Sequence, residues 1–251
     1  MTPRPLIAAL TFLLATAVAI PARAADPLCQ KYETGANAVL VVVDRTSPLG
    51  DGRKKQAALE GLKFALDSLI PGDLLIVTTV EETAVMRKPI FRDCWPGRER
   101  SLFKRPLDPV ILDTDQTAFR AQLNGAFAKD LKDNRSTKSR SPIMDTLAVA
   151  TRNLQNVRVK SLILVSDLIE RDAVTLDPLT PLNEQRIRDV MDVAQTKKLL
   201  ASLNKAEVHV FGYGFEDMNE KPLNSDVRES LAELWRRYFQ RSGAELIDIR
   251  R

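Results

Sequence analysis

The sequence predicts an α/β fold with a doubly wound, mostly parallel central sheet and helices on both of its faces. Short apolar segments alternate with amphipathic segments along the chain, which is the pattern of strands joined by crossover helices. Three of the apolar segments end at charged or turn residues, as buried parallel strands do. Strands are predicted at 38–43, 74–80, an edge position after 85, 161–165, 207–211 and 245–249.

The strand predictions depend on composition and on the residues that bound each run. Ala38–Val43 is rich in β-branched residues, which favour strands, and it ends at Asp44. In a doubly wound sheet the loops after parallel strands gather at one edge, so the residues that follow the strands are expected to lie close together. The residues that bound the other runs are Pro71-Gly72-Asp73, Ser166-Asp167 and Gly212-Tyr213-Gly214.

Two helices in the first half are predicted from apolar residues spaced three and four apart. Arg53–Ile70 carries such a stripe and is stopped by Pro71. Asp115–Leu131 carries phenylalanine and leucine side chains at intervals of four, and either Asp113 or Thr114 would cap its first turn.

Three further helices are predicted in the second half. Ser141 is expected to cap a helix that has Pro142 at its first position, where proline is well tolerated, and that ends near Asn156. The other two are predicted at 182–203 and 226–240, again from apolar residues on one stripe.

The N-terminus is organised like a secretory signal peptide. Arg4 precedes the mainly apolar stretch Leu6–Ile20, and Ala22-Arg23-Ala24 is a small-residue cleavage sequence. The stretch is shorter than the roughly 18 apolar residues of a spanning helix, so cleavage is favoured over an uncleaved anchor. We expect a signal peptide at 1–24, a single domain at 25–251, export to the bacterial periplasm and no stable membrane insertion after cleavage.

Composition gives little support to a nucleic-acid partner. The formal net charge is +4, and two of the positive charges, Arg4 and Arg23, belong to the predicted signal peptide. Gly212-Tyr213-Gly214 lacks the third glycine of a dinucleotide-binding fingerprint, and a turn explains it better.

The two cysteines, Cys29 and Cys94, are predicted to form a disulfide, because paired cysteines of exported proteins are usually oxidised. Two free thiols are the alternative. Catalysis by cysteine is not expected, since the single histidine, His209, lies inside an alternating, strand-like run.

A basic irregular excursion is predicted at about 87–109, after the edge strand. The predicted disulfide would attach it to the N-terminal segment. Such a charge run is usually a solvated loop, but it could also dock on an acidic surface. Its basic residues are Arg87, Lys88, Arg92, Arg98, Arg100, Lys104 and Arg105.

The order of these motifs resembles the von Willebrand factor A domain family. The shared features are a strand ending in Asp44, an amphipathic helix, Pro71-Gly72-Asp73 before the next strand, a Ser-Pro helix start at Ser141, and a strand ending in Ser166-Asp167. The resemblance covers most of the chain from Ala38 onward. Each motif is short, so their order and spacing carry the resemblance.

The resemblance implies a metal-ion-dependent adhesion site at the C-terminal edge of the sheet, where the cation takes a carboxylate from a partner protein. Asp44, Thr46, Ser141 and Asp167 match the ligand positions of the family. Pro48 stands where the pattern has a second serine, so the site would be degenerate. Oxygen ligands of this kind suit Mg²⁺, Mn²⁺ or Ca²⁺.

The same four residues also have a purely structural explanation. The two aspartates could accept hydrogen bonds from loop amides, and the two hydroxyl residues could cap turns and helices. Arg45 and the basic stretch Lys132–Arg140 add positive charge near the site, which weakens cation binding. Both interpretations stay open at this level.

The sequence favours a non-enzymatic, periplasmic protein-interaction module, because the family binds partners and no catalytic constellation is recognised. Two alternatives stay open. Asp44 and Asp167 could hold Mg²⁺ for hydrolysis of phosphate esters, although Thr46 stands where an aspartyl-phosphate enzyme usually has a second aspartate. The chain could also be a structural subunit of an envelope, secretion or conjugation assembly that docks through its basic excursion.

Overall fold

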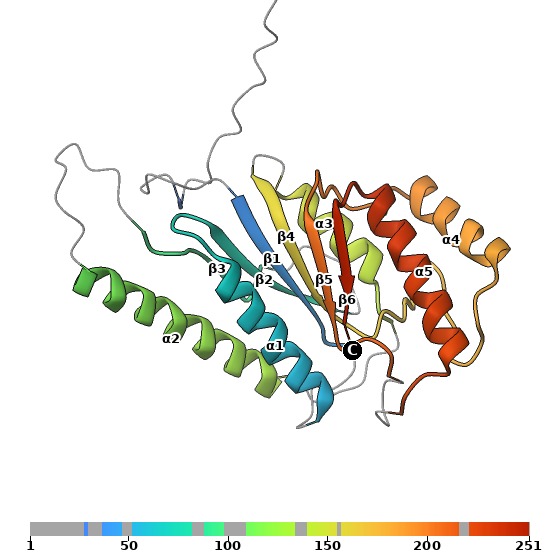
Figure 1. Ribbon diagram of the computed structural model, residues 1–251, viewed down its shortest axis with the longest axis horizontal. Helices are drawn as coiled ribbons and strands as arrows, with labels where there is room; N and C mark the ends of the chain where they lie inside the picture. The colour runs from blue at the N-terminus through green and yellow to red at the C-terminus, as the bar shows by residue number, and fades with distance from the viewer. Residues whose placement is uncertain are drawn as a thin grey trace, which may run out of the picture.

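A six-stranded sheet with helices on both faces forms the centre of the protein (Figure 1). The computed structural model describes residues 28–29, 37–46, 52–81, 88–97, 109–133, 140–154, 157–215 and 221–250. The predicted signal peptide at 1–24 lies outside the described residues.

The sheet is parallel except at one edge. Its strands lie in the order β3-β2-β1-β4-β5-β6, and only the β2–β3 pair is antiparallel. The predicted α/β fold with a mostly parallel sheet is thereby confirmed. The strands are β1 (Asn37–Asp44), β2 (Leu74–Val80), β3 (Phe91–Cys94), β4 (Arg158–Val165), β5 (Glu207–Phe211) and β6 (Leu246–Ile249).

β1 is one of the two middle strands of the sheet, and its side chains are apolar on both faces. Residues 38–43 are at most 1% exposed, and the strand pairs in parallel with β2 and β4. The register places Asp44 beside Val80 of β2, and Val43 beside Val165 of β4. Asp44 therefore leaves the sheet at the same edge as the loop after β4.

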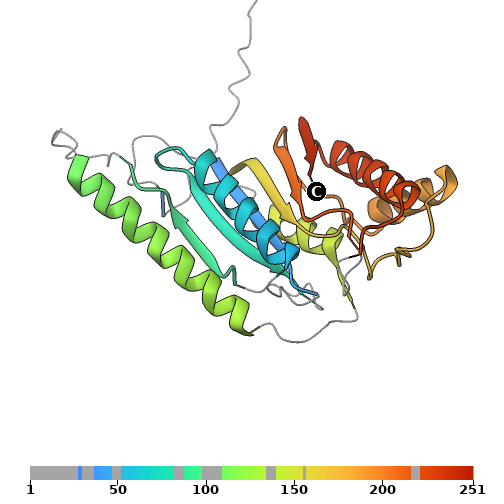
Figure 2. The same cartoon turned by 60° about the horizontal axis from the view of Figure 1, so that its bottom comes forward.

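Helices cover both faces. In the described part of the chain, α1 and α2 pack on one face, and α3, α4 and α5 pack on the other (Figure 2). None of the helices in that part combines the length and apolarity needed to cross a membrane. The helices are α1 (Arg53–Ser68), α2 (Pro109–Asp133), α3 (Ile143–Arg152), α4 (Glu184–Thr196) and α5 (Ser225–Arg241).

Helix α2 extends beyond its predicted bounds at both ends. It begins at Pro109, a residue whose fixed φ suits the first helical position. Asp113 and Thr114 therefore lie inside the helix, and the prediction that one of them caps it was wrong. Phe119 is buried as expected, and its ring lies edge-on to that of Trp95, with the two ring centroids 5.1 Å apart.

Helices α3 and α4 are shorter than predicted. Pro142 is the N-cap of α3 and Ile143 its first residue, with no side-chain hydrogen bond at the cap, so the prediction that Ser141 caps this helix was wrong. Helix α4 stops early, and Lys198, just beyond its end, has a φ of 58° that cannot continue a helix. Asn183 caps the start of α4 by accepting a hydrogen bond from the Arg186 amide.

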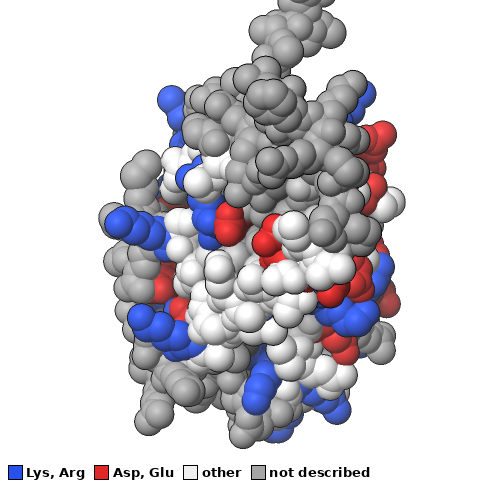
Figure 3. Space-filling model, turned by 90° about the vertical axis from the view of Figure 1, so that its left-hand side faces the viewer, with Lys and Arg blue, Asp and Glu red and all other residues white. Residues whose placement is uncertain are grey.

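The predicted basic excursion is described at residues 88–97, and the rest of it up to 108 lies outside the described residues. Within the described part, Lys88 and Arg92 are exposed. On this end of the molecule the described positive side chains are separated by uncharged and negative ones and do not form one continuous patch (Figure 3). The edge strand within this segment, β3, is antiparallel to β2, which the sequence did not indicate.

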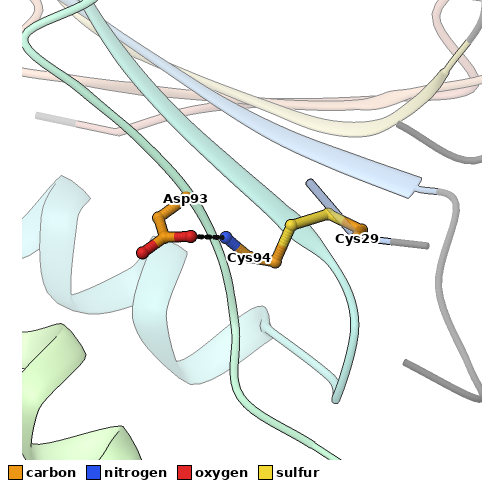
Figure 4. Close-up of a disulfide and its surroundings, with 3 residues drawn as sticks. All are labelled: Cys29, Asp93 and Cys94. Atoms are coloured by element: carbon orange, nitrogen blue, oxygen red, sulfur yellow. Dashed lines mark hydrogen bonds between the residues drawn. A yellow bond between two sulfur atoms is a disulfide. The ribbon is translucent and has the colours of Figure 1, made fainter. Parts of the chain in front are cut away.

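A disulfide joins Cys94, at the end of β3, to Cys29, which precedes β1 (Figure 4). The two Cα atoms are 5.5 Å apart, and both residues are only 2% exposed. The Cys94 amide donates a hydrogen bond to Asp93 Oδ1 at 2.8 Å. A side chain thus satisfies a backbone donor of the edge strand, which discourages pairing with another chain.

We predict that the Cys29→Ser/Cys94→Ser double variant loses roughly 4 kcal/mol of unfolding free energy, because the bridge closes a loop with a sequence separation of 65 residues. Urea unfolding followed by circular dichroism measures the loss. Wild-type protein unfolded in the presence of a reductant should match the variant. A variant as stable as the oxidised wild type would contradict the prediction.

Candidate functional site

Asp44 is the centre of a polar cluster at the edge where the parallel strands end. Asp44 is only 8% exposed. Oδ2 accepts hydrogen bonds from the hydroxyls of Ser141 at 3.1 Å and Ser166 at 2.9 Å. Oδ1 accepts from the hydroxyl of Thr46 at 2.7 Å and from its amide at 3.0 Å. One carboxylate therefore joins the loop after β1, the approach to α3 and the end of β4.

Asp167 lies in the same cluster and faces a lysine. Its Oδ1 accepts a hydrogen bond from the Ile169 amide at 2.9 Å. Its Oδ2 lies 3.9 Å from Nζ of Lys54, a residue in the first turn of α1. Asp44, Lys54, Ser166 and Asp167 are the polar lining of a hollow of about 10 Å³. That volume is close to the minimum that holds a single water molecule.

The structure thus brings together all four residues that the sequence indicated, Asp44, Thr46, Ser141 and Asp167. Pro48, which breaks the family pattern, lies outside the described residues. Cation binding by these four residues stays a prediction. The hydrogen bonds described above are also those expected of residues that only stabilise the loops and turns.

The positive charge of Arg45, the residue after Asp44, is paired with other acidic side chains. Its guanidinium forms an ion pair with Asp130 of α2 and lies 3.6 Å from Glu81, which follows β2. Its Nη2 also donates a hydrogen bond to the Asp130 carbonyl at 3.2 Å. These contacts attach the C-terminal half of α2 to the edge where Asp44 lies.

The loop after β4 is held in a strained conformation. Leu168 is fully buried and has a φ of 68°, in the left-handed region that a leucine rarely adopts. Its carbonyl accepts a hydrogen bond from Nε1 of Trp235 in α5 at 2.8 Å, and its amide donates to Ser166 Oγ at 2.9 Å. The position of Asp167 is therefore set by contacts on both sides of it.

Glu170 is a buried carboxyl that the sequence analysis did not select. It is 0% exposed, and its Oε2 accepts a hydrogen bond from the Met144 amide, in the first turn of α3, at 2.9 Å. Its pKa is raised to about 8, mainly by burial and to a smaller degree by the charges of Asp172 and Asp44, while the amides of Met144 and Ala173 act in the opposite direction. At neutral pH this carboxyl is mostly protonated. The signal for its burial in the sequence was its position directly after two apolar residues, Leu168-Ile169.

Lys54 and Ser166 were also missed as members of the site. The signal for Lys54 was electrostatic. Helix α1 begins with Arg53-Lys54-Lys55 and has no acidic residue in its first turn, the reverse of what the helix dipole favours. Such a placement indicates that negative charge reaches the helix start from elsewhere in the fold.

The oxygen atoms of this cluster are suitable ligands for a divalent cation, but the positive charge already present beside them is unfavourable for one. Carboxylate and hydroxyl oxygens are suitable ligands for Mg²⁺, and Asp44, Thr46, Ser141 and Asp167 supply them. Lys54, however, already places a positive charge beside Asp167, and a second cation in so small a hollow would be repelled at short range. No group of three or more His, Cys, Asp or Glu side chains in the described ranges is arranged to hold a metal ion.

In comparisons with known proteins, no family model and no curated protein matches the chain. The resemblance to the von Willebrand factor A domain family therefore stays a prediction from the motifs of the sequence.

We predict that Asp44→Asn destabilises the fold by roughly 2 kcal/mol, because the amide cannot replace a charged acceptor of several hydrogen bonds. Urea unfolding at neutral pH measures the effect. Asp189→Asn, an exposed position on α4, is the control and should change the free energy of unfolding by less than about 0.5 kcal/mol. Equal losses in the two variants would contradict a central role for Asp44.

We predict that Glu170 makes stability fall as the pH rises. The folded-state pKa of about 8 exceeds the ordinary value of 4.5, so the folded protein binds the proton more tightly than the unfolded chain. Wild-type stability should therefore decline between about pH 4.5 and 8. Glu170→Gln should match wild type near pH 4 and exceed it at pH 9.

Chemical unfolding across this pH range tests the Glu170 prediction, with Glu245→Gln, at an exposed position, as the control. Parallel pH profiles for wild type and Glu170→Gln would show that the buried carboxyl does not govern stability.

Proposed function

We propose that the protein is a non-enzymatic, periplasmic interaction module of the von Willebrand factor A type, which binds a partner protein at the carboxyl-end edge of its sheet. The observation that carries the proposal is the convergence of Asp44, Ser141, Ser166 and Asp167 at this edge. Open parallel sheets bind their ligands at the carboxyl ends of the strands. The Cys29–Cys94 disulfide supports an oxidising, exported location.

The dimensions of the cluster favour protein binding over turnover of a small molecule. Its hollow of about 10 Å³ is far smaller than the 300 Å³ or more that is typical of small-molecule sites. The side chain two residues after Asp44 is Thr46, whose hydroxyl donates to Asp44 instead of supplying a second carboxylate. These features favour a surface that is contacted by another protein over a phosphoester hydrolase.

Exposed groups around the cluster indicate the chemistry of the partner. Arg140, directly before Ser141, has a side chain that is 54% exposed and pairs with Asp172. Arg53, the first residue of α1, is exposed and lies over the ring of Phe215, with its guanidinium carbon 4.7 Å from the ring centroid. Arginine and aromatic side chains are enriched in protein interfaces. A partner surface that presents acidic side chains would complement them.

We predict that Arg140→Glu weakens partner binding at least about tenfold, because charge reversal at this edge repels an acidic surface. The matched control is Arg158→Glu. Arg158 is the exposed first residue of β4 and lies where the parallel strands begin, opposite the edge where they end. The partner is identified by co-purification from the envelope fraction, and the affinity of the two purified proteins is then measured by calorimetry.

Equal weakening by Arg140→Glu and Arg158→Glu, or no weakening by either, would place the partner elsewhere on the molecule. Hydrolysis of p-nitrophenyl phosphate by the wild-type protein with Mg²⁺ would contradict the non-enzymatic assignment.

A further inference from the structure

The first turn of α1 carries three positive side chains and no acidic one. The three are those of Arg53-Lys54-Lys55. The N-cap is Gly52, which has no side chain that could cap the helix. The helix dipole adds partial positive charge at the same place. Lys54 is nevertheless only 16% exposed, so its ammonium is partly withdrawn from water at this unfavourable position.

Negative charge reaches Lys54 from the loop after β4. Oδ2 of Asp167 lies 3.9 Å from Nζ of Lys54, and the Lys54 side chain lines the same hollow as Asp44 and Ser166. The strained backbone at Leu168 and its hydrogen bond to Trp235 keep this loop in position. The ion pair therefore joins the start of α1 to the loop after β4.

We propose that Lys54 is the resident cation of this edge, and that its ammonium takes the place that a divalent metal ion would otherwise occupy. The oxygen donors around Asp44 and Asp167 would attract a hard cation, but the ammonium of Lys54 already lies 3.9 Å from Asp167, and Lys54 lines the same hollow as Asp44. The hollow of about 10 Å³ leaves no room for a hydrated metal ion beside the ammonium.

A consequence for regulation follows, and it rests on the proposed function. A metal-dependent site would lose its partner when the cation is chelated. A site whose cation is a lysine side chain would bind its partner equally well with and without divalent cations, because the positive charge cannot dissociate.

Calorimetric titration of the full-length mature chain with Mn²⁺ tests the proposal. Lys54→Met removes the charge and keeps an unbranched side chain, and Lys54→Gln is a second variant in case methionine disturbs packing. Lys63→Met is the matched control, because Lys63 is also on α1 but is exposed and pairs with Asp67. Thermal unfolding with and without Mn²⁺ provides a second readout.

We expect the Lys54 variants to bind Mn²⁺ at least about tenfold more tightly than wild type and Lys63→Met, since a repelling charge has been removed. Adding Asp167→Asn to Lys54→Met should abolish the acquired affinity. Mn²⁺ should raise the unfolding temperature of the Lys54 variants only. Equal Mn²⁺ affinity in wild type and the Lys54 variants, whether high or undetectable, would overturn the proposal.

The titration does not involve the partner, so it decides the role of Lys54 even if the proposed interaction fails. Where the partner is in hand, its affinity for wild-type protein should be unchanged by EDTA. Loss of partner binding in EDTA would overturn the assignment of Lys54 while leaving the interaction itself established.

Discussion

The edge where the parallel strands end depends on one buried carboxylate, which belongs to the last residue of β1. A carboxylate that is almost enclosed by protein must be hydrogen-bonded, because an unpaired buried charge is strongly destabilising. Asp44 meets this requirement with the hydroxyls of Ser141, Ser166 and Thr46. Because these donors belong to three separate segments, satisfying a single side chain fixes the relative positions of the loop after β1, the start of α3 and the end of β4.

This constraint also explains how the start of α3 is organised. Ser141 precedes Pro142 and would serve as a local cap, but its hydroxyl is committed to Asp44. The first turn of α3 is served instead by Glu170, which accepts from the Met144 amide across 26 residues of sequence. A distant carboxyl thus takes over the role of a local cap. The exchange couples α3 to the loop that carries Asp167, and the burial of Glu170 makes that coupling sensitive to pH.

Charge is arranged in pairs around the same edge. Arg45 is matched by Asp130 and Glu81, and Lys54 is matched by Asp167. Each pair joins a residue near the end of β1 or the start of α1 to a different element. Arg140, which pairs with Asp172, and Arg53 are the more exposed positive groups nearby.

Much of the fold was predictable because its signals are local. The β-branched run at Ala38–Val43 forms β1, the spacing of apolar residues predicts α1 and α5, and parallel strands bring Asp44 and Asp167 to one edge. The candidate site was predictable only as far as residues that follow strands. Its hydroxyl and carboxyl members could be named, but not which of them would bond to which.

The sequence by itself determined the alternation of strands and helices, the parallel sheet and the gathering of Asp44 and Asp167, because hydrophobic period and strand ends are properties of short segments. Only the tertiary structure decided the antiparallel direction of β3, the role of Ser141 as a donor to Asp44, and the placement of Lys54 and Glu170. Each of these depends on burial and on partners far away in sequence, which change the energy of a polar group more than its neighbours in the chain do.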